Sequence, residues 1–498
     1  MKFDRLAARL ADRPDIVQTP SAARTTKLES CRLRPPHGRT LPDGDEGHLE
    51  YFPLARSGNL MNIPRRRRLA VVMHADSSAH KRKLYYGWIV VGALALAITG
   101  GYGILTYAFT VFVKPMSAEL GWTTGQLTSA YSLSGLVSVV FGPILGRLLD
   151  RHGSRVIMSV GTIAAILLLL AWSSVTQIGM FYAIIFLLTG ASISVLYPPA
   201  FWTISSWFSR KRRRALTLLT FTGGFAAIIF TPLTQALITS YGWRTTLVIY
   251  AGILFCLNLP LLAILLRRRP ADMGLPVDGE AQQSDAIGEV LHSEQLLDVT
   301  LGIAVRHAGF WWLTAAFALN SIVITFMVIH FVPFLIERHY TPSFAAGVYG
   351  LIGVGSLPGR LIFTPLGDRI APGWISVFIF LAQTAAFLVL ATGQGDWAVV
   401  VFLILFAAGY GAISPTNAAL IADLFGVRHY GTISGVISMV SDATTAIILT
   451  VLAILRDRWG SYTELVWVLV ILSTLSVICM ITAWKRREIP SRITPEPA

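Results

Sequence analysis

The chain has 498 residues, of which 54% are hydrophobic and 14% are charged, and its mean hydropathy is +0.61. A soluble globular protein carries about 25% charged residues, so this composition excludes that class and places most of the chain in lipid. The formal net charge of +14 does not indicate nucleic-acid binding, because residues 1–83 alone hold 17 Lys and Arg against 9 Asp and Glu.

Residues 1–83 form a polar, basic segment that has no apolar run of membrane length and no h-region of a signal peptide. Their composition predicts a disordered cytoplasmic tail, and we assign it no activity. The alternative is that translation starts at Met61 or Met73, in which case residues 1–60 do not belong to the protein.

Twelve apolar runs follow the tail, and each is long enough to cross a membrane, which takes a helix of roughly 20 apolar residues. They fall at about 85–112, 126–148, 156–176, 178–206, 213–240, 244–266, 308–336, 343–366, 374–392, 396–422, 430–455 and 462–484. The segment between the sixth and seventh runs carries seven carboxylates and reads as a polar linker. We therefore expect an all-α membrane protein with two six-helix bundles, divided as 84–266 (N-terminal bundle), 267–306 (cytoplasmic linker), 307–485 (C-terminal bundle) and 486–498 (cytoplasmic tail).

The basic residues predict the orientation in the membrane. Loops after the even-numbered helices hold 14 Lys and Arg, whereas loops on the other side hold five. The positive-inside rule then places both termini in the cytoplasm. We expect the chain to cross the cytoplasmic (inner) membrane of the cell repeatedly. We interpret the basic run at 210–214 as an anchor of this topology rather than a lipid or nucleic-acid patch.

Two short turns repeat one motif. Asp150-Arg151 and Asp368-Arg369 lie 218 residues apart, and Tyr131 and Tyr349 are separated by the same interval. A period of this length in an apolar chain indicates two membrane halves built alike.

The first turn reads G-x-x-x-D-R-x-G-x-R and resembles the signature of the major facilitator superfamily. Its residues are Gly146, Asp150, Arg151, Gly153 and Arg155. The resemblance implies a transporter that works by alternating access. It also implies a conformational latch on the cytoplasmic side, built from these residues with Asp368 and Arg369, in which the aspartate meets a helix N-terminus and the arginine meets a carboxylate.

Other phrases resemble the monocarboxylate porter and oxalate–formate antiporter branch of this superfamily. They are Tyr86-Gly87-Trp88 at the start of helix 1, the stretch 107–114, and Glu119-Leu120-Gly121-Trp122. The resemblance covers about 85–485. It implies a small organic anion, above all a monocarboxylate, as the substrate.

Arg360 is the predicted substrate-binding residue. It lies within helix 8, where monocarboxylate porters carry a substrate-contacting arginine, and the repeat places Gly142 at the equivalent position of the first half. A cation inside a span is costly unless it faces the bundle interior, and a guanidinium binds a carboxylate with two parallel hydrogen bonds. The alternative is an arginine that extends to the cytoplasmic surface or pairs with Asp368.

Asp442 lies in the middle of helix 11. We expect a carboxylate at that depth to take up a proton unless a cation pairs with it, which suits a proton-coupling site or an ion pair with Arg360. A protonated carboxyl with a purely structural hydrogen bond is the alternative.

Further polar side chains are predicted to line a substrate cavity. They are Tyr107, Tyr131, Asn320 and Asn417.

Two departures weaken the resemblance in detail. Tyr107 stands where animal monocarboxylate porters have a helix 1 lysine, and Ser356 stands where they have an acidic residue.

Pro198-Pro199 and Pro415 occupy matched places in the two halves, and we expect them to break helices 4 and 10.

Three other functions are alternatives to anion transport. Efflux of a hydrophobic or cationic compound would use Asp442 as the cation site, and the test is which of Arg360 and Asp442 faces the cavity. A membrane-embedded enzyme is not expected, because the spans hold no HExxH, GxSxG or paired aspartates. A membrane sensor would need a folded tail or linker. No P-loop occurs, so we expect no bound nucleotide. We also expect no cofactor and no metal. The expected state is a monomer whose partners are the substrate anion, protons and membrane lipid.

Overall fold

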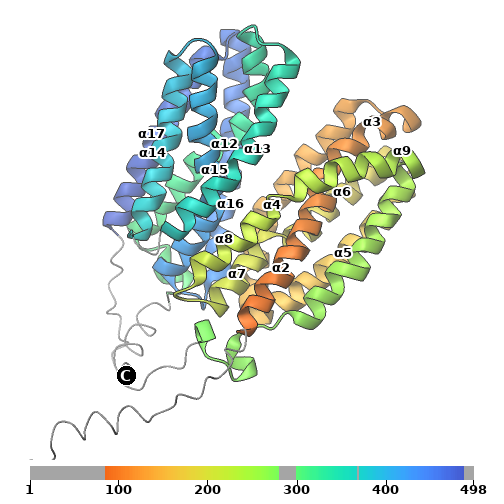
Figure 1. Cartoon of the computed structure of the whole chain (residues 1–498), viewed down its shortest axis with the longest axis vertical. Coiled ribbons are helices and arrows are strands. Elements are labelled where there is room, and N and C mark those ends of the chain that lie inside the picture. The colour runs from red at the N-terminus through yellow and green to blue at the C-terminus, as the bar shows by residue number, and fades with distance from the viewer. Residues whose placement is uncertain (1–84, 280–298, 367–369, 487–498) are drawn as a thin grey trace, which may run out of the picture. The chain divides into compact units, whose positions relative to one another are not determined.

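The protein is all-helical, and a computed structural model describes residues 85–279, 299–366 and 370–486 (Figure 1). The N-terminal half consists of α2 (Tyr86–Tyr102), η2 (Gly103–Tyr107), α3 (Phe109–Leu120), α4 (Thr124–His152), α5 (Ser154–Ser173), α6 (Ile178–Val195), α7 (Tyr197–Trp207), α8 (Arg212–Gly223), α9 (Ala226–Ile253), η3 (Leu254–Asn258) and η4 (Leu261–Leu265). The C-terminal half consists of α12 (Ala308–Glu337), α13 (Pro342–Leu366), α14 (Pro372–Thr392), α15 (Asp396–Phe425), α16 (Tyr430–Trp459) and α17 (Thr463–Lys485). Between the halves lie three short helices, η5 (Pro270–Met273), η6 (Val277–Gly279) and α11 (Leu301–Ala304).

The described residues contain eleven helical stretches that are long and apolar enough to cross a membrane. One of them, Arg212–Leu265, has 54 residues, which at 1.5 Å per residue is more than twice the thickness of a hydrocarbon core. Gly242 has φ 78° and ψ 163° inside α9, a conformation that glycine adopts without strain and that turns the chain back. The stretch is therefore two spans, which makes twelve spans among the described residues.

The fourth span is broken and the tenth is not. Leu196 leaves the helical region with ψ −147°, so α6 ends before it and α7 begins at Tyr197. Pro415, in contrast, lies inside the uninterrupted helix α15, and the predicted break in helix 10 is wrong. The reason is that Pro198 and Pro199 remove two successive backbone donors, whereas Pro415 removes one.

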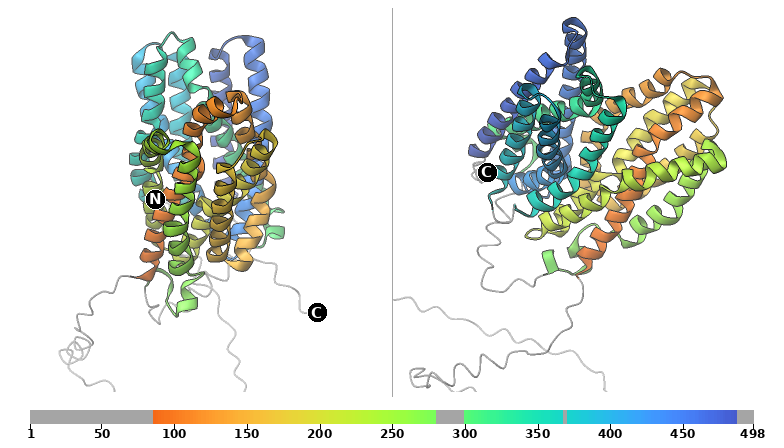
Figure 2. Two further views of the ribbon diagram at one scale, coloured as in Figure 1. Left: turned by 90° about the vertical axis from the view of Figure 1, so that its right-hand side faces the viewer. Right: turned by 45° about the horizontal axis from the view of Figure 1, so that its top comes forward.

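Pairs of helices from the two halves pack against each other. The main pairs are α4 with α16 and α8 with α13, and α7 and α8 also touch α15. We call the end of the spans where α4 ends and α8 begins the basic end, because Arg151 and the run Arg210 to Arg214 lie there. The short helix η6 lies beside α2 and α7 at this end (Figure 2).

Labelling of one introduced cysteine tests the predicted orientation. Ala271, in η5 at the basic end, is exposed. In a background without Cys31, Cys256 and Cys479, we expect Ala271→Cys to react with a membrane-impermeant maleimide only after the cytoplasmic face is made accessible. Reaction in intact cells would show that the orientation in the membrane is the opposite of the predicted one.

Candidate functional site

A cavity of about 360 Å³ lies between the two halves. Residues of α7, α12, α15 and α16 form its walls, and its polar members are Tyr197, Asn320, Ser321, Tyr410, Ser414, Asn417, Tyr430, Ser434, Ser438, Ser441 and Asp442. A second cavity of about 230 Å³ is lined by residues of α2, α4, α6, α7 and α16. Pro198, Ser434, Ser438 and Asp442 line both, so the two cavities meet at α16.

Arg360 lies near Tyr197, which is a residue of the larger cavity's wall. Its helix, α13, is pressed against α15, since a side chain on Gly359 would collide with the backbone of Ala408. The next residue, Arg360, therefore turns toward α8, and its guanidinium donates a hydrogen bond to the carbonyl oxygen of Thr220. Its Nε atom is buried without an acceptor within the described residues.

Four tyrosines interact with this guanidinium. Tyr197 interacts with it through its side chain, and Tyr102, Tyr107 and Tyr410 interact with it electrostatically. Tyr107 ends the π-helical turn η2, where the first span widens, and such turns are frequent at functional sites. A guanidinium with tyrosine hydroxyls nearby can bind an oxyanion.

Asp442 faces both cavities. Within the part of the chain that the structure describes, this carboxylate has no hydrogen-bond or ion-pair partner. The ion pair with Arg360 that the sequence left open is thus not formed here. Arg360 itself does not line either cavity, whereas Tyr197 and Tyr410, which interact with it, line the larger one.

The other predicted cavity residues divide into two groups. Asn320 and Asn417 line the larger cavity, and the Asn320 side chain donates to Oε1 of Gln383 at 2.6 Å. Tyr131 lines neither cavity. It stacks on Phe109 with ring centroids 4.5 Å apart and is 39% exposed, so its position gives no support to substrate contact.

Asp150 lies against the N-terminus of α16, the kind of contact that the family resemblance implies. Its carboxylate accepts hydrogen bonds from the backbone N–H of Gly431 at 2.9 Å and of Thr432 at 2.7 Å. It also accepts from the Thr432 hydroxyl at 2.6 Å and from the Trp202 indole at 3.0 Å. The carboxylate thus joins α4 and α7 of one half to the positive end of a helix in the other.

Glycines bring α4 and α16 close enough for this contact. A side chain on Gly146 would collide with the backbone of Gly431, and a Cβ on Gly435 would lie 2.6 Å from the carbonyl oxygen of Gly142. Small residues spaced by four thus face each other on both helices.

The remaining residues of the motif have separate positions. Gly153, with φ 78°, turns the chain between α4 and α5. Arg155 donates to the carbonyl oxygen of Ala263 at 2.8 Å, while Arg151 is exposed and has no carboxylate partner within the described residues. Asp368 and Arg369 lie outside the described residues.

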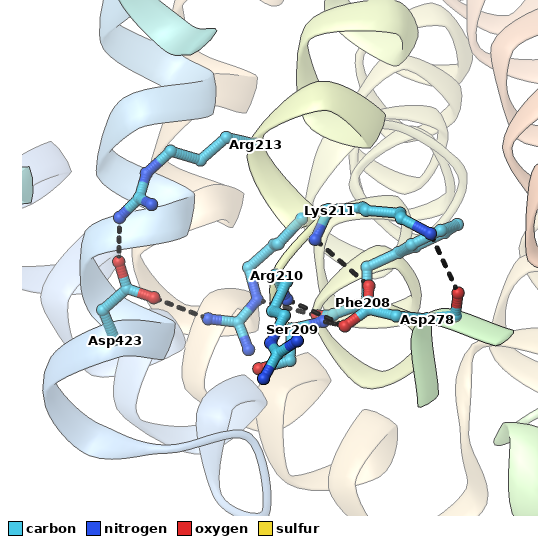
Figure 3. Close-up of polar contacts among 8 residues, drawn as sticks. Phe208, Ser209, Arg210, Lys211, Arg213, Asp278 and Asp423 are labelled. Carbon is cyan, nitrogen blue, oxygen red and sulfur yellow. Dashed lines mark hydrogen bonds and ion pairs between the residues drawn. The ribbon is translucent and has the colours of Figure 1, made fainter. Parts of the chain in front are cut away.

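Two carboxylates at the basic end were not identified from the sequence (Figure 3). Asp423 of α15 pairs with Arg212 at 2.8 Å and with Arg213, and so ties the start of α8 to the C-terminal half. Asp278 of η6 accepts from the backbone N–H groups of Ser209, Arg210 and Lys211 at 3.1, 2.8 and 3.1 Å. The run Arg210 to Arg214 is therefore part of a junction between the halves and the linker, in addition to any role in topology.

Replacing Asp278 by alanine should destabilise this junction. Three N–H donors that precede α8 would lose their acceptor, and the loss of a helix cap costs about 0.5–2 kcal/mol. We expect the melting temperature of the purified protein to fall by roughly 2–4 °C, and Asp278→Asn, which keeps one acceptor oxygen, to fall less. Asp272→Ala is the matched control, because that carboxylate accepts only from Arg269 in its own turn. Equal melting of Asp278→Ala and Asp272→Ala would contradict the junction.

Comparisons with known proteins identify relatives along most of the chain. Residues 93–448 match the family model of the Major Facilitator Superfamily. Monocarboxylate transporter 13 of Rattus norvegicus is 25% identical over 389 residues, covering 76% of this chain and 84% of that protein. Monocarboxylate transporter 11 of Homo sapiens is 26% identical over 400 residues, covering 76% and 79%.

Solved structures share the fold at low identity. The proton:xylose symporter XylE bound to 6-bromo-6-deoxy-D-glucose aligns with a TM-score of 0.62 at 11% identity, covering 80% of this chain and 95% of that one. The transporter FucP in the outward conformation aligns with a TM-score of 0.60 at 15% identity, covering 80% and 99%.

Proposed function

The chain is a secondary transporter that belongs to the major facilitator superfamily, and we propose that it carries a small organic anion with one carboxylate group. The names of the monocarboxylate transporters that it resembles support this substrate class. We further propose that it works as a monomer in the cytoplasmic membrane with both termini in the cytoplasm.

The surroundings of Arg360 carry the proposal. A buried Nε donor without an acceptor is unfavourable by about 1–3 kcal/mol, and the guanidinium to which it belongs interacts with Tyr197 of the cavity wall. A substrate carboxylate that reaches between Tyr197 and Tyr410 would supply the acceptor oxygens. No other arginine of the described spans combines such a donor with a position next to the larger cavity.

The same arginine offers a route from binding to conformational change. Arg360 belongs to the C-terminal half, and its present acceptor, Thr220, belongs to the N-terminal half. A carboxylate that takes over these donors would weaken the contact between α8 and α13 at the moment of binding. Asp442, which faces both cavities, would take up a proton on one side of the membrane and release it on the other.

Uptake into proteoliposomes tests the substrate class and the coupling. We expect radiolabelled short carboxylates to accumulate faster when an inward proton gradient is imposed. Asp442→Asn should keep carboxylate exchange and lose the response to the gradient, because the amide cannot bind a proton. Accumulation without any dependence on pH, in the wild type, would contradict proton coupling through Asp442.

One observation favours a second candidate, the export of a cationic compound. Asp442 lines both cavities whereas Arg360 lines neither, so the cavity wall itself carries an acidic group. A cation exporter would lose substrate binding in Asp442→Asn and keep it in Arg360→Lys. The anion transporter should behave in the opposite way.

A further inference from the structure

The wall of the larger cavity carries many hydroxyl and amide groups. Helix α16 presents Ser434, Ser438, Ser441 and Asp442 to the cavity, at a spacing that puts them on one face of the helix. Opposite them, α15 presents Ser414 and Asn417, and α12 presents Asn320 and Ser321.

Most of these groups are not engaged by the protein. Ser434 donates to the Gly431 carbonyl oxygen at 3.1 Å, and Asn320 bonds to Gln383. The structure gives no hydrogen-bond partner, within the described residues, to the side chains of Ser414, Asn417 and Ser438. The hydroxyl of Ser441 is buried without a partner as well.

These free groups bear on what fits the cavity. An alkyl carboxylate would cover them with methylene groups, and a polar group that loses water without gaining a hydrogen bond is destabilised. A ligand with its own hydroxyls would replace the lost hydrogen bonds. Sites built in this way discriminate strongly against analogues that lack the hydroxyl.

The cavity is also large enough for such a ligand. Its volume of about 360 Å³ has room for a six-carbon acid with a hydroxyl on each remaining carbon.

We propose that the substrate is a polyhydroxylated monocarboxylate of the sugar-acid type. This rests on the proposed function, since Arg360 and its tyrosines hold the carboxylate. The hydroxyl groups bond to Ser438 on α16 and to Ser414 and Asn417 on α15. Specificity within the organic anions thus comes from α15 and α16, and charge recognition comes from α13.

Equilibrium binding to the purified transporter tests the proposal with three probes of equal carbon number: gluconate, hexanoate and 6-aminohexanoate. We expect gluconate to bind at least tenfold more tightly than hexanoate. The double variant Ser414→Ala/Ser438→Ala should raise the Kd of gluconate at least tenfold and leave that of hexanoate within twofold. Thr450→Ala is the matched control, because it removes a hydroxyl from an exposed position of the same helix as Ser438.

The outcomes separate this inference from the function on which it rests. If hexanoate binds as tightly as gluconate and Arg360→Lys weakens both, the anion transporter stands and the sugar-acid inference fails. If 6-aminohexanoate binds most tightly and Asp442→Asn abolishes that binding, the ligand is a zwitterion and the inference fails. Absence of binding by every probe to folded protein overturns both proposals. Should the double variant fold poorly, Asn417→Ala serves in its place, with the same selective loss of gluconate expected.

Discussion

Asp150→Ala should open the basic end of the transporter and reduce transport at least tenfold. The carboxylate accepts four hydrogen bonds, three of them from the first turn of α16 in the other half. Hydrogen bonds to a charged group contribute about 1.5–3 kcal/mol each, and about 5.5 kcal/mol is enough to move a two-state equilibrium from 99:1 to 1:99. The alanine variant should therefore leave the present conformation for one in which α4 and α16 separate.

Cysteine accessibility measures this change directly. Leu145 lies on α4 and is 2% exposed at the wall of the smaller cavity. A cysteine at this position should react slowly with a maleimide added from the basic end, and faster once Asp150→Ala is introduced. Asp457→Ala is the control, because Asp457 is an exposed carboxylate near the opposite end of α16. Unchanged labelling together with unchanged transport would show that Asp150 is not a latch.

The helices could be predicted because their signal is local. Each apolar run has the length of one membrane crossing, and the predicted run 308–336 differs from α12 by one residue at its end. The contact of Asp150 followed from a family motif, and the structure has the implied geometry at α16. The same motif implied a carboxylate for Arg151, which the described residues do not provide.

The junction at Asp278 and Asp423 could not be predicted, because its signal is not periodic. Asp278 was one of seven carboxylates in a polar linker, and nothing in its neighbours distinguishes it except the Asp-Gly pair that favours a turn. Asp423 lies at the end of an apolar helix, where a charge is expected to meet water. Only the fold brings them to the basic run, since the pairs join residues 67 to 211 positions apart.

The candidate site, too, could be predicted from the sequence only in part. An arginine and an aspartate stand out in any apolar span, so the sequence points to Arg360 and Asp442, whose roles stay predictions. It does not point to Tyr102 and Tyr410, because a tyrosine in a span is ordinary and only the fold brings it near Arg360. Nor could a sequence reveal that Arg360 and Asp442 do not pair in the structure, which leaves separate roles open to them.

Arg360→Lys should weaken carboxylate transport by about tenfold or more while expression and melting temperature stay unchanged. Lysine keeps the positive charge and can still donate to the carbonyl oxygen of Thr220, so the tie between α13 and α8 should survive. An ammonium cannot reproduce the two aligned donors of the planar fork. Losing one charge-assisted hydrogen bond to the substrate costs about 1.5–3 kcal/mol, and 1.4 kcal/mol is a factor of ten in affinity.

The substrate concentration at half-maximal uptake is the quantity to measure, because loss of a binding contact raises it. Arg338→Lys is the matched control: this arginine follows α12, donates to the Gly393 carbonyl oxygen at 3.1 Å and lines neither cavity. Both variants exchange arginine for lysine, so an effect that they share comes from the exchange and not from the loss of a contact with the substrate. If Arg360→Lys transports carboxylates normally, the guanidinium serves only to join the two halves through Thr220. The acidic cavity wall at Asp442 would then be the better guide to the substrate, and export of a cation would become the leading function.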